Sequence, residues 1–214
     1  MRATEFLIIT EGRAMPTIVV DVQPEYAYYT DQNENTCKDI IHFVNSQTGP
    51  VLMFVNAEES GVSGDTLAFI KQYWENVDEE DWDDNDPSVV TNPVNWNRFS
   101  VVDKGYGHFR AWMDHGISPA AIIRIIRAMY QHKINDSREF EDLDIDPAEI
   151  VGSEWDAWMW NDPIIVNWTS VAQLKQFSGA YLVGGGRNEC LREVEILMNA
   201  FNIKYKRIDS LVYG

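Results

Sequence analysis

The strongest constraint on the fold is a series of short apolar segments that alternate with amphipathic segments of helical spacing. Four apolar segments stand out, at residues 17–20 (TIVV), 51–55 (VLMFV), 99–102 (FSVV) and 180–183 (AYLV). Short continuous apolar runs are typical of parallel strands covered on both faces. They predict four buried strands, with a candidate last strand at 204–208.

The segments between these strands have apolar residues at helical spacing. They predict helices at 35–45, 65–74, 119–132, 170–177 and 190–201. Asn35 or Thr36 is the expected cap of the first helix, and Ser118 the expected cap before Pro119. Strands that alternate with helices predict an α/β fold, with a mostly parallel sheet flanked by helices in a three-layer, Rossmann-like arrangement.

The length of the chain favours a single domain that spans residues 1–214. Its 214 residues are 45% hydrophobic, which is enough for a sizeable core. Residues 135–163 are hard to assign to this pattern and are interpreted as an insertion. That segment carries Trp155, Trp158 and Trp160, which we expect in the core or an oligomer contact; a lid over the site is the alternative.

The net charge of the chain limits the classes of molecule that it is expected to bind. The formal net charge of −17 repels nucleic-acid phosphates and anionic membrane surfaces, so neither is an expected partner. No apolar run approaches the roughly 18 residues of a membrane span. The apolar run at 6–10 is too short for a signal peptide, so we expect a cytoplasmic protein. Two cysteines, Cys37 and Cys190, do not make a disulfide framework, although a single disulfide stays open.

Three reactive side chains follow predicted strands. Asp21 ends the first strand, Lys104 comes just after the third, and Cys190 follows the fourth strand and its glycine turn. Because ligands bind at the carboxyl ends of the strands in an open parallel sheet, we expect these three side chains to converge.

The three residue types can together perform nucleophilic chemistry. A helix N-terminus and a nearby lysine would lower the pKa of the Cys190 thiol. Asp21 could take the thiol proton, and amides of the glycine turn could stabilise an oxyanion. The alternatives are a Cys190 that is merely buried, an Asp21 that caps a turn and a Lys104 on the surface.

Four segments, in order, resemble the isochorismatase-like cysteine hydrolases, a superfamily that includes nicotinamidases, carbamoylsarcosine amidases and ureidoacrylate amidohydrolases. They are TIVVDVQPEY, VLMFVN, VVDKGYGHF and VGGGRNECLREVEILMNAFNI, which together cover about half of the chain. The resemblance implies that Asp21 is the general base, Lys104 the stabiliser of the thiolate and transition state, and Cys190 the nucleophile.

The resemblance also implies further parts of a site. A non-proline cis peptide would lie near Gly185–Gly186, and the amides of Gly186 and Cys190 would form an oxyanion hole. Residues that flank the matched positions are candidates for substrate binding: Gln23, Tyr26, Asn56, Tyr106, His108 and Arg187.

The chain also departs from the family's pattern. Residues 56–59 (NAEE) stand where metal-using nicotinamidases carry an Asp-Trp-His motif, so we expect no catalytic metal and no cofactor. Glu189, beside the nucleophile, could raise the pKa of the thiol and oppose its activation.

The expected function is that of a metal-independent cysteine hydrolase acting on a small amide, ureide or related carbonyl compound. Oligomers are common among relatives, so a homo-oligomer stays open. The isochorismatase branch itself cleaves a vinyl ether and need not form a thioester, so the bond type stays open as well. The alternative is an inactive protein of this fold that binds a macromolecular partner through its acidic surface.

Overall fold

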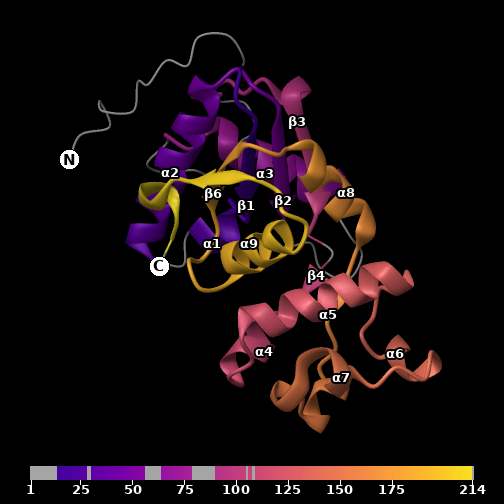
Figure 1. Ribbon diagram of the computed structural model, residues 1–214. Helices are drawn as coiled ribbons and strands as arrows, with labels where there is room; N and C mark the ends of the chain where they lie inside the picture. The colour runs from indigo at the N-terminus through magenta and orange to yellow at the C-terminus, as the bar shows by residue number, and fades with distance from the viewer. Residues whose placement is uncertain are drawn as a thin grey trace.

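The computed structural model describes residues 14–27, 30–55, 64–78, 90–104, 106–107 and 109–213. Its main sheet is entirely parallel, with the strand order β3-β2-β1-β6-β7 (Figure 1). The strands are β1 (Thr17–Val20), β2 (Val51–Val55), β3 (Phe99–Asp103), β6 (Ala180–Gly184) and β7 (Tyr205–Arg207). The four strands expected from the apolar segments are therefore present, and the candidate last strand forms the β7 edge.

The central strand β1 pairs with β2 on one side and with β6 on the other. Val19 lies opposite Met53 and Val183 in the two registers. All four residues of β1 and all five of β2 are buried, which explains why their sequences are continuously apolar rather than alternating.

Helices cover both faces of this sheet. Helices α2 (Asp31–Ser46) and α3 (Gly64–Glu75) pack their apolar side chains on one face, whereas α8 (Trp168–Gln176) and α9 (Cys190–Ala200) pack on the other. Alternate residues of β1, such as Ile18 and Val19, contribute to the two opposite cores. The protein therefore has the predicted three-layer, Rossmann-like α/β fold.

The helix caps follow from local hydrogen bonds. Ser118 accepts a hydrogen bond from the amide of Ala121 and caps α5 (Pro119–His132), as predicted. The helix predicted at 35–45 is present in α2, but its predicted cap was wrong: the helix begins at Asp31, one turn earlier, because Thr30 accepts from the amide of Asn33.

A long excursion separates β3 from α8. It is closed at its base, where β4 (Tyr106–Gly107) pairs antiparallel with β5 (Ile165–Val166). Between them lie α4 (Phe109–Asp114), α5, α6 (Glu139–Asp142), α7 (Pro147–Val151) and two short 3-10 helices, Gly152–Glu154 and Ala157–Trp160. We call residues 109–164 the lobe. The segment expected as an insertion, 135–163, is thus the second half of a larger excursion.

The lobe packs on the α9 side of the sheet, in the lower part of Figure 1. Helix α5 contacts both α9 and α7, and its apolar face belongs to the same core as β1 and β2. Arg127 of α5 donates to the carbonyl oxygens of Ala200 (2.7 Å) and Asn199 (3.3 Å), at the end of α9.

Two other tryptophans of the lobe pack on the buried Trp112. The ring centroids of Trp155 and Trp158 both lie 6.2 Å from that of Trp112, and Trp160 packs on Trp155. These rings pack against the larger core, which favours the expected core role over a lid. Within the described ranges, no helix combines the length and apolar character that crossing a membrane requires.

Candidate active site at the carboxyl ends of the strands

The candidate site lies where the order of the strands reverses. The chain places β2 and β3 on one side of β1, and then returns to place β6 and β7 on the other. The loops after β1 and β6 therefore leave neighbouring strands at the same edge and diverge, which opens a crevice in folds of this type. Asp21 follows β1, and Cys190 follows β6 and its turn.

Asp21 is held in an unusual backbone conformation. Its φ angle is +49°, in the left-handed region that aspartate tolerates better than most side chains. The amide of Asp21 donates to Phe54 (2.9 Å), and the buried Tyr213 hydroxyl donates to the Asp21 carbonyl oxygen (2.7 Å). These bonds fix the side chain inside the protein, where the residue is only 1% exposed.

The carboxylate of Asp21 has few partners. Apart from the weak donor Cys190, no described residue hydrogen-bonds to either oxygen. Burial raises the pKa of Asp21; the Lys104 charge and the Cys190 thiol oppose this rise only in part. A buried carboxylate with a raised pKa and spare acceptor capacity is a good proton acceptor.

Lys104 reaches the site from the end of β3. Its amide donates to Val55 (3.0 Å), and the residue is 8% exposed. The ammonium nitrogen lies 3.9 Å from Asp21 Oδ2 and 3.0 Å from Glu193 Oε2. Burial by itself would lower the pKa of Lys104, but these two carboxylates outweigh it and raise that pKa, so the lysine stays charged.

The turn before Cys190 depends on two glycines with positive φ angles, Gly184 (+83°) and Gly185 (+64°). A side chain on Gly184 would come within 2.4 Å of the Val20 carbonyl oxygen. The backbone of Tyr213 clamps this turn, because its amide donates to Gly185 (3.1 Å). The turn thus brings Cys190, the first residue of α9, next to Asp21.

The expectation of a lowered thiol pKa was wrong. Burial and the neighbouring Asp21 raise the pKa of Cys190 to about 12, and Lys104 lowers it only in part. Lys104 does not compensate fully, because burial is the largest cause of the raised pKa and the charge of Asp21 adds to it. Glu189, which the sequence suggested as the opposing charge, instead pairs with Arg110 at 2.6 Å. Cys190 is therefore a thiol at neutral pH.

Sequence reasoning missed Glu193 as a member of this site. It is 5% exposed, and its two oxygens accept from the Lys104 ammonium and from the Arg110 amide (3.3 Å). Glu193 follows Cys190 by three residues, so both lie on the same face of α9. That spacing of three residues from Cys190 was the sequence feature that could have identified Glu193.

A pocket of about 690 Å³ opens beside Cys190. It is lined by Asp21, Glu25, Tyr26, Thr30, Gln32, Asn33, Arg110, Gly186, Arg187, Asn188, Glu189, Cys190 and Tyr213. Of the residues predicted to bind substrate, Tyr26 and Arg187 line this pocket. Gln23 is buried outside this lining and donates to Glu25 (3.3 Å).

Several other predictions concern the same region. Asn56 and His108 lie outside the described residues, as does the side chain of Tyr106. The predicted cis peptide is wrong: the described backbone contains none, and the glycine turn is built from positive φ angles. Gly186 borders the pocket together with Cys190, and their oxyanion role stays a prediction.

The second cysteine does not line the pocket, although it contacts Tyr213, which does. Cys37 is buried on α2, and its thiol lies 3.6 Å from the Tyr213 hydroxyl. Both cysteines are free thiols, so the disulfide left open by the sequence does not form. Burial raises the pKa of Cys37 to about 11. Among the described residues, no group of three or more His, Cys, Asp or Glu side chains is arranged to hold a metal ion.

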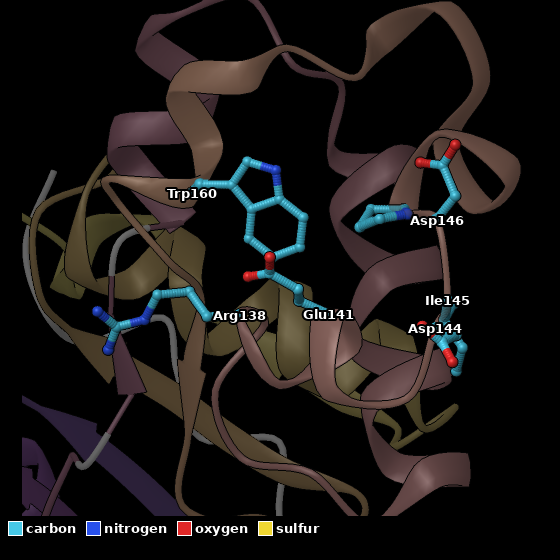
Figure 2. A pocket seen from close by; sticks show the side chains of 7 residues that line it. Arg138, Glu141, Asp144, Ile145, Asp146 and Trp160 are labelled. Atoms are coloured by element: carbon cyan, nitrogen blue, oxygen red, sulfur yellow. The ribbon is translucent and has the colours of Figure 1, made fainter.

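A second hollow, of about 570 Å³, lies in the lobe. Figure 2 shows the Trp160 indole at this hollow and the Arg138 guanidinium turned away from the acidic side chains. Arg138 instead pairs with Asp136, 3.1 Å from its Oδ1 atom. The residues that line the hollow do not include Asp21, Lys104 or Cys190, so it is separate from the candidate site.

A scan against protein-family models, a search of curated proteins and a search of solved structures each returned no match. The likeness to isochorismatase-like hydrolases therefore stays an expectation drawn from the four sequence segments.

Proposed function

We propose that the protein is a cysteine hydrolase that cleaves a small amide, a ureide or a related carbonyl compound. The observation that carries the proposal is that Asp21 and Cys190 line one pocket and that the Lys104 ammonium lies 3.9 Å from Asp21, although the three residues are distant along the chain. Their place at the reversal of strand order is the usual ligand site of this fold class. A merely structural thiol would not need a buried acid and a buried lysine beside it.

The first chemical step is attack by Cys190 on the substrate carbonyl carbon. Since the thiol is protonated at rest, its proton passes to the Asp21 carboxylate as the carbon–sulfur bond forms. The Lys104 ammonium stabilises the negative charge that develops nearby, and a buried charge does so effectively because little water screens it. Asp21 then returns the proton to the leaving amine, and a thioester remains on Cys190.

The second step is hydrolysis of that thioester. Asp21 accepts a proton from a water molecule as the water oxygen attacks the thioester carbon. As the carbon–sulfur bond breaks, Asp21 returns its proton to the leaving sulfur, which releases a carboxylic acid, restores the Cys190 thiol and balances the protons over the cycle. The one carboxylate serves as base and then as acid, for which its raised pKa is suited.

The pocket favours a small polar substrate. Its volume of about 690 Å³ is within the range of ordinary ligand sites. Thr30, Gln32, Asn33 and Asn188 offer neutral hydrogen-bonding groups, and Arg187 offers a cation already paired with Asp209 at 2.9 Å. These groups match the carbonyl and N–H groups of an amide or ureide.

The test combines a substrate panel with mass spectrometry. Small amides and ureides are mixed with the protein, quenched in acid, and examined by intact mass for an acyl adduct. We expect an adduct on Cys190 and turnover of the same compound, both abolished in Cys190→Ala. Turnover should fall by at least about 1,000-fold, because the nucleophile is removed.

Cys37 is the internal control for this test. Iodoacetamide should label Cys190, which borders the pocket, far faster than the buried Cys37. Equal labelling of the two thiols, or undiminished turnover in Cys190→Ala, would show that Cys190 is not the nucleophile. A protein with an unreactive Cys190 and no turnover would instead fit the inactive, partner-binding alternative.

A further inference from the structure

The buried carboxylate of Glu193 has a role that the three expected residues leave unexplained. The Lys104 ammonium lies 3.0 Å from Glu193 and 3.9 Å from Asp21, so the lysine is held nearer to the unexpected acid. The second oxygen of Glu193 accepts from the Arg110 amide at 3.3 Å, at the beginning of α4. Glu193 therefore joins three elements at the site: α9, the end of β3 and the lobe.

The charges at the site do not balance while Glu193 is ionised. Two carboxylates, Asp21 and Glu193, share the Lys104 ammonium, which leaves one negative charge when Cys190 is protonated. A thiolate would add a second negative charge to a site with little water. The nearby guanidinium of Arg110 is directed to Glu189 (2.6 Å) and Asp114 (3.4 Å). The other charged groups around the thiol and the pocket are Glu25, Asp103 and Arg187.

We propose that Glu193 is a positioning residue, which holds the Lys104 ammonium away from Asp21 so that Cys190 keeps its proton in the resting enzyme. The inference rests on the proposed function, because it assigns Glu193 a part in the same proton transfer. With Lys104 drawn toward Glu193, Asp21 is a stronger proton acceptor when the thiol attacks. The proton then moves from sulfur to Asp21 only when a substrate carbonyl is in place.

The electrostatics of the site agree in direction with this arrangement. Burial is the largest cause of the raised pKa of both Asp21 and Cys190, and the charge of Glu193 raises both pKa values further. A nearby like charge disfavours the charged form of a group, and the charge of Glu193 contributes less to the raised pKa of Cys190 than burial and Asp21 do. Removing the Glu193 charge should therefore lower the pKa of Cys190 and weaken Asp21 as a base.

The experiment measures the reactivity of the thiol rather than turnover. Rates of Cys190 alkylation by iodoacetamide are followed by peptide mass mapping between about pH 6 and 10. The thiolate fraction sets this rate well below the pKa. Glu193→Gln keeps the size of the side chain and removes its charge. We expect alkylation at a given pH to be roughly tenfold faster, which corresponds to a fall of about one unit in the pKa of the thiol.

Glu193→Asp is the matched control because it keeps the charge. Its alkylation rate should stay within about threefold of the wild-type rate. Cys37 reports on folding, since only a loosened structure would expose it. If Glu193→Gln exposes Cys37, Glu193→Met removes the same charge in a side chain better suited to burial, and the same tenfold increase is expected.

Two outcomes would overturn the inference. One is that Cys190 is alkylated no faster in Glu193→Gln and Glu193→Met than in the wild-type protein, while Cys37 stays protected. The other is a Glu193→Asp rate as high as that of Glu193→Gln, which would show that the charge is not responsible. Alkylation needs no substrate, so a failed search for turnover leaves this result standing. An acyl adduct on Cys190 with an unchanged alkylation rate in Glu193→Gln would reject only the role of Glu193.

Discussion

At the scale of single residues, Asp21 has several features that lower the stability of the protein and that a purely structural role would not require. Asp21 combines a positive φ angle, burial and a carboxylate that lacks strong hydrogen-bond donors among the described residues. Each of these costs stability, and such costs gather where a residue performs chemistry. The buried Tyr213 hydroxyl donates a hydrogen bond to the Asp21 carbonyl oxygen, so a contact in the core holds the strained backbone in place.

Replacing the Asp21 carboxylate should therefore stabilise the protein. Asn tolerates the same positive φ angle, so Asp21→Asn removes the buried charge without a backbone penalty. We expect the free energy of unfolding at pH 7 to rise by about 1 kcal/mol, while any turnover is lost. Denaturant unfolding at several pH values measures this change.

The sign of the pH dependence follows from the raised pKa of Asp21. The folded state binds the Asp21 proton more tightly than the unfolded state, so wild-type stability falls as the pH rises through the folded pKa. The advantage of Asp21→Asn should grow with pH and vanish below the unfolded pKa of about 4. Asp209→Asn is the control, since Arg187 lowers the pKa of that exposed carboxyl and no gain is expected. A less stable Asp21→Asn variant at pH 7 would contradict the argument.

Some residues of the site were predictable, and others were not. The predictable residues each follow an apolar run: Asp21, Lys104 and Cys190. The carboxyl ends of parallel strands lie at one edge of the sheet, so residues at such positions are expected to lie close together. Glu193 was missed because a glutamate in the first turn of a helix is usually a solvated partner of the helix dipole. Tyr213 lies near the end of the chain, after the last strand, where no local pattern shows what its hydroxyl will contact.

At the scale of elements, the glycine turn after β6 determines where the thiol lies. Gly184 needs both its positive φ angle and its lack of a side chain, because β1 passes directly beside it. Gly179 has a similar positive φ angle of +91°, but open space surrounds the position of a side chain. The two positions therefore separate the cost of the backbone angle from the cost of close packing.

Substituting these two glycines should have unequal effects. Gly179→Ala should cost about 1 kcal/mol of stability, from the backbone angle alone. Gly184→Ala should cost at least about 3 kcal/mol, because the methyl group also meets the Val20 carbonyl oxygen. It should also slow alkylation of Cys190, since the turn must shift. Urea denaturation and thiol labelling test both effects. Equal stability losses in Gly179→Ala and Gly184→Ala would show that β1 can shift to accommodate the methyl group with little loss of stability.

Element boundaries were predictable only where local chemistry decides them. Helix α5 has the expected bounds because Ser118 and Pro119 specify its first turn. The start of α2 was misplaced because several residues before Asn35 can cap a helix, and only the folded chain shows that Thr30 does so. The second half of the lobe consists of helices of three to five residues, too short to show periodicity.

At the scale of the whole molecule, the lobe and the sheet share one core. Ile126 of α5, Leu197 of α9 and Phe54 of β2 belong to a single cluster of buried apolar side chains. Cys37 lies in the other cluster, on the opposite face of the sheet. Because the buried apolar side chains described in the lobe belong to the core that covers the sheet, we expect the chain to unfold as one unit, in line with the single domain predicted from sequence.

Truncating Ile126 tests this unity. Ile126→Ala should lower the free energy of unfolding by about 3 kcal/mol, because the side chain is fully buried. Far-UV circular dichroism, tryptophan fluorescence and the exposure of Cys37 should all shift to the same lower denaturant midpoint. Leu143→Ala, at an exposed position of the lobe, should change stability by less than about 0.5 kcal/mol. A fluorescence transition that moved alone while Cys37 stayed protected would show that the lobe unfolds independently.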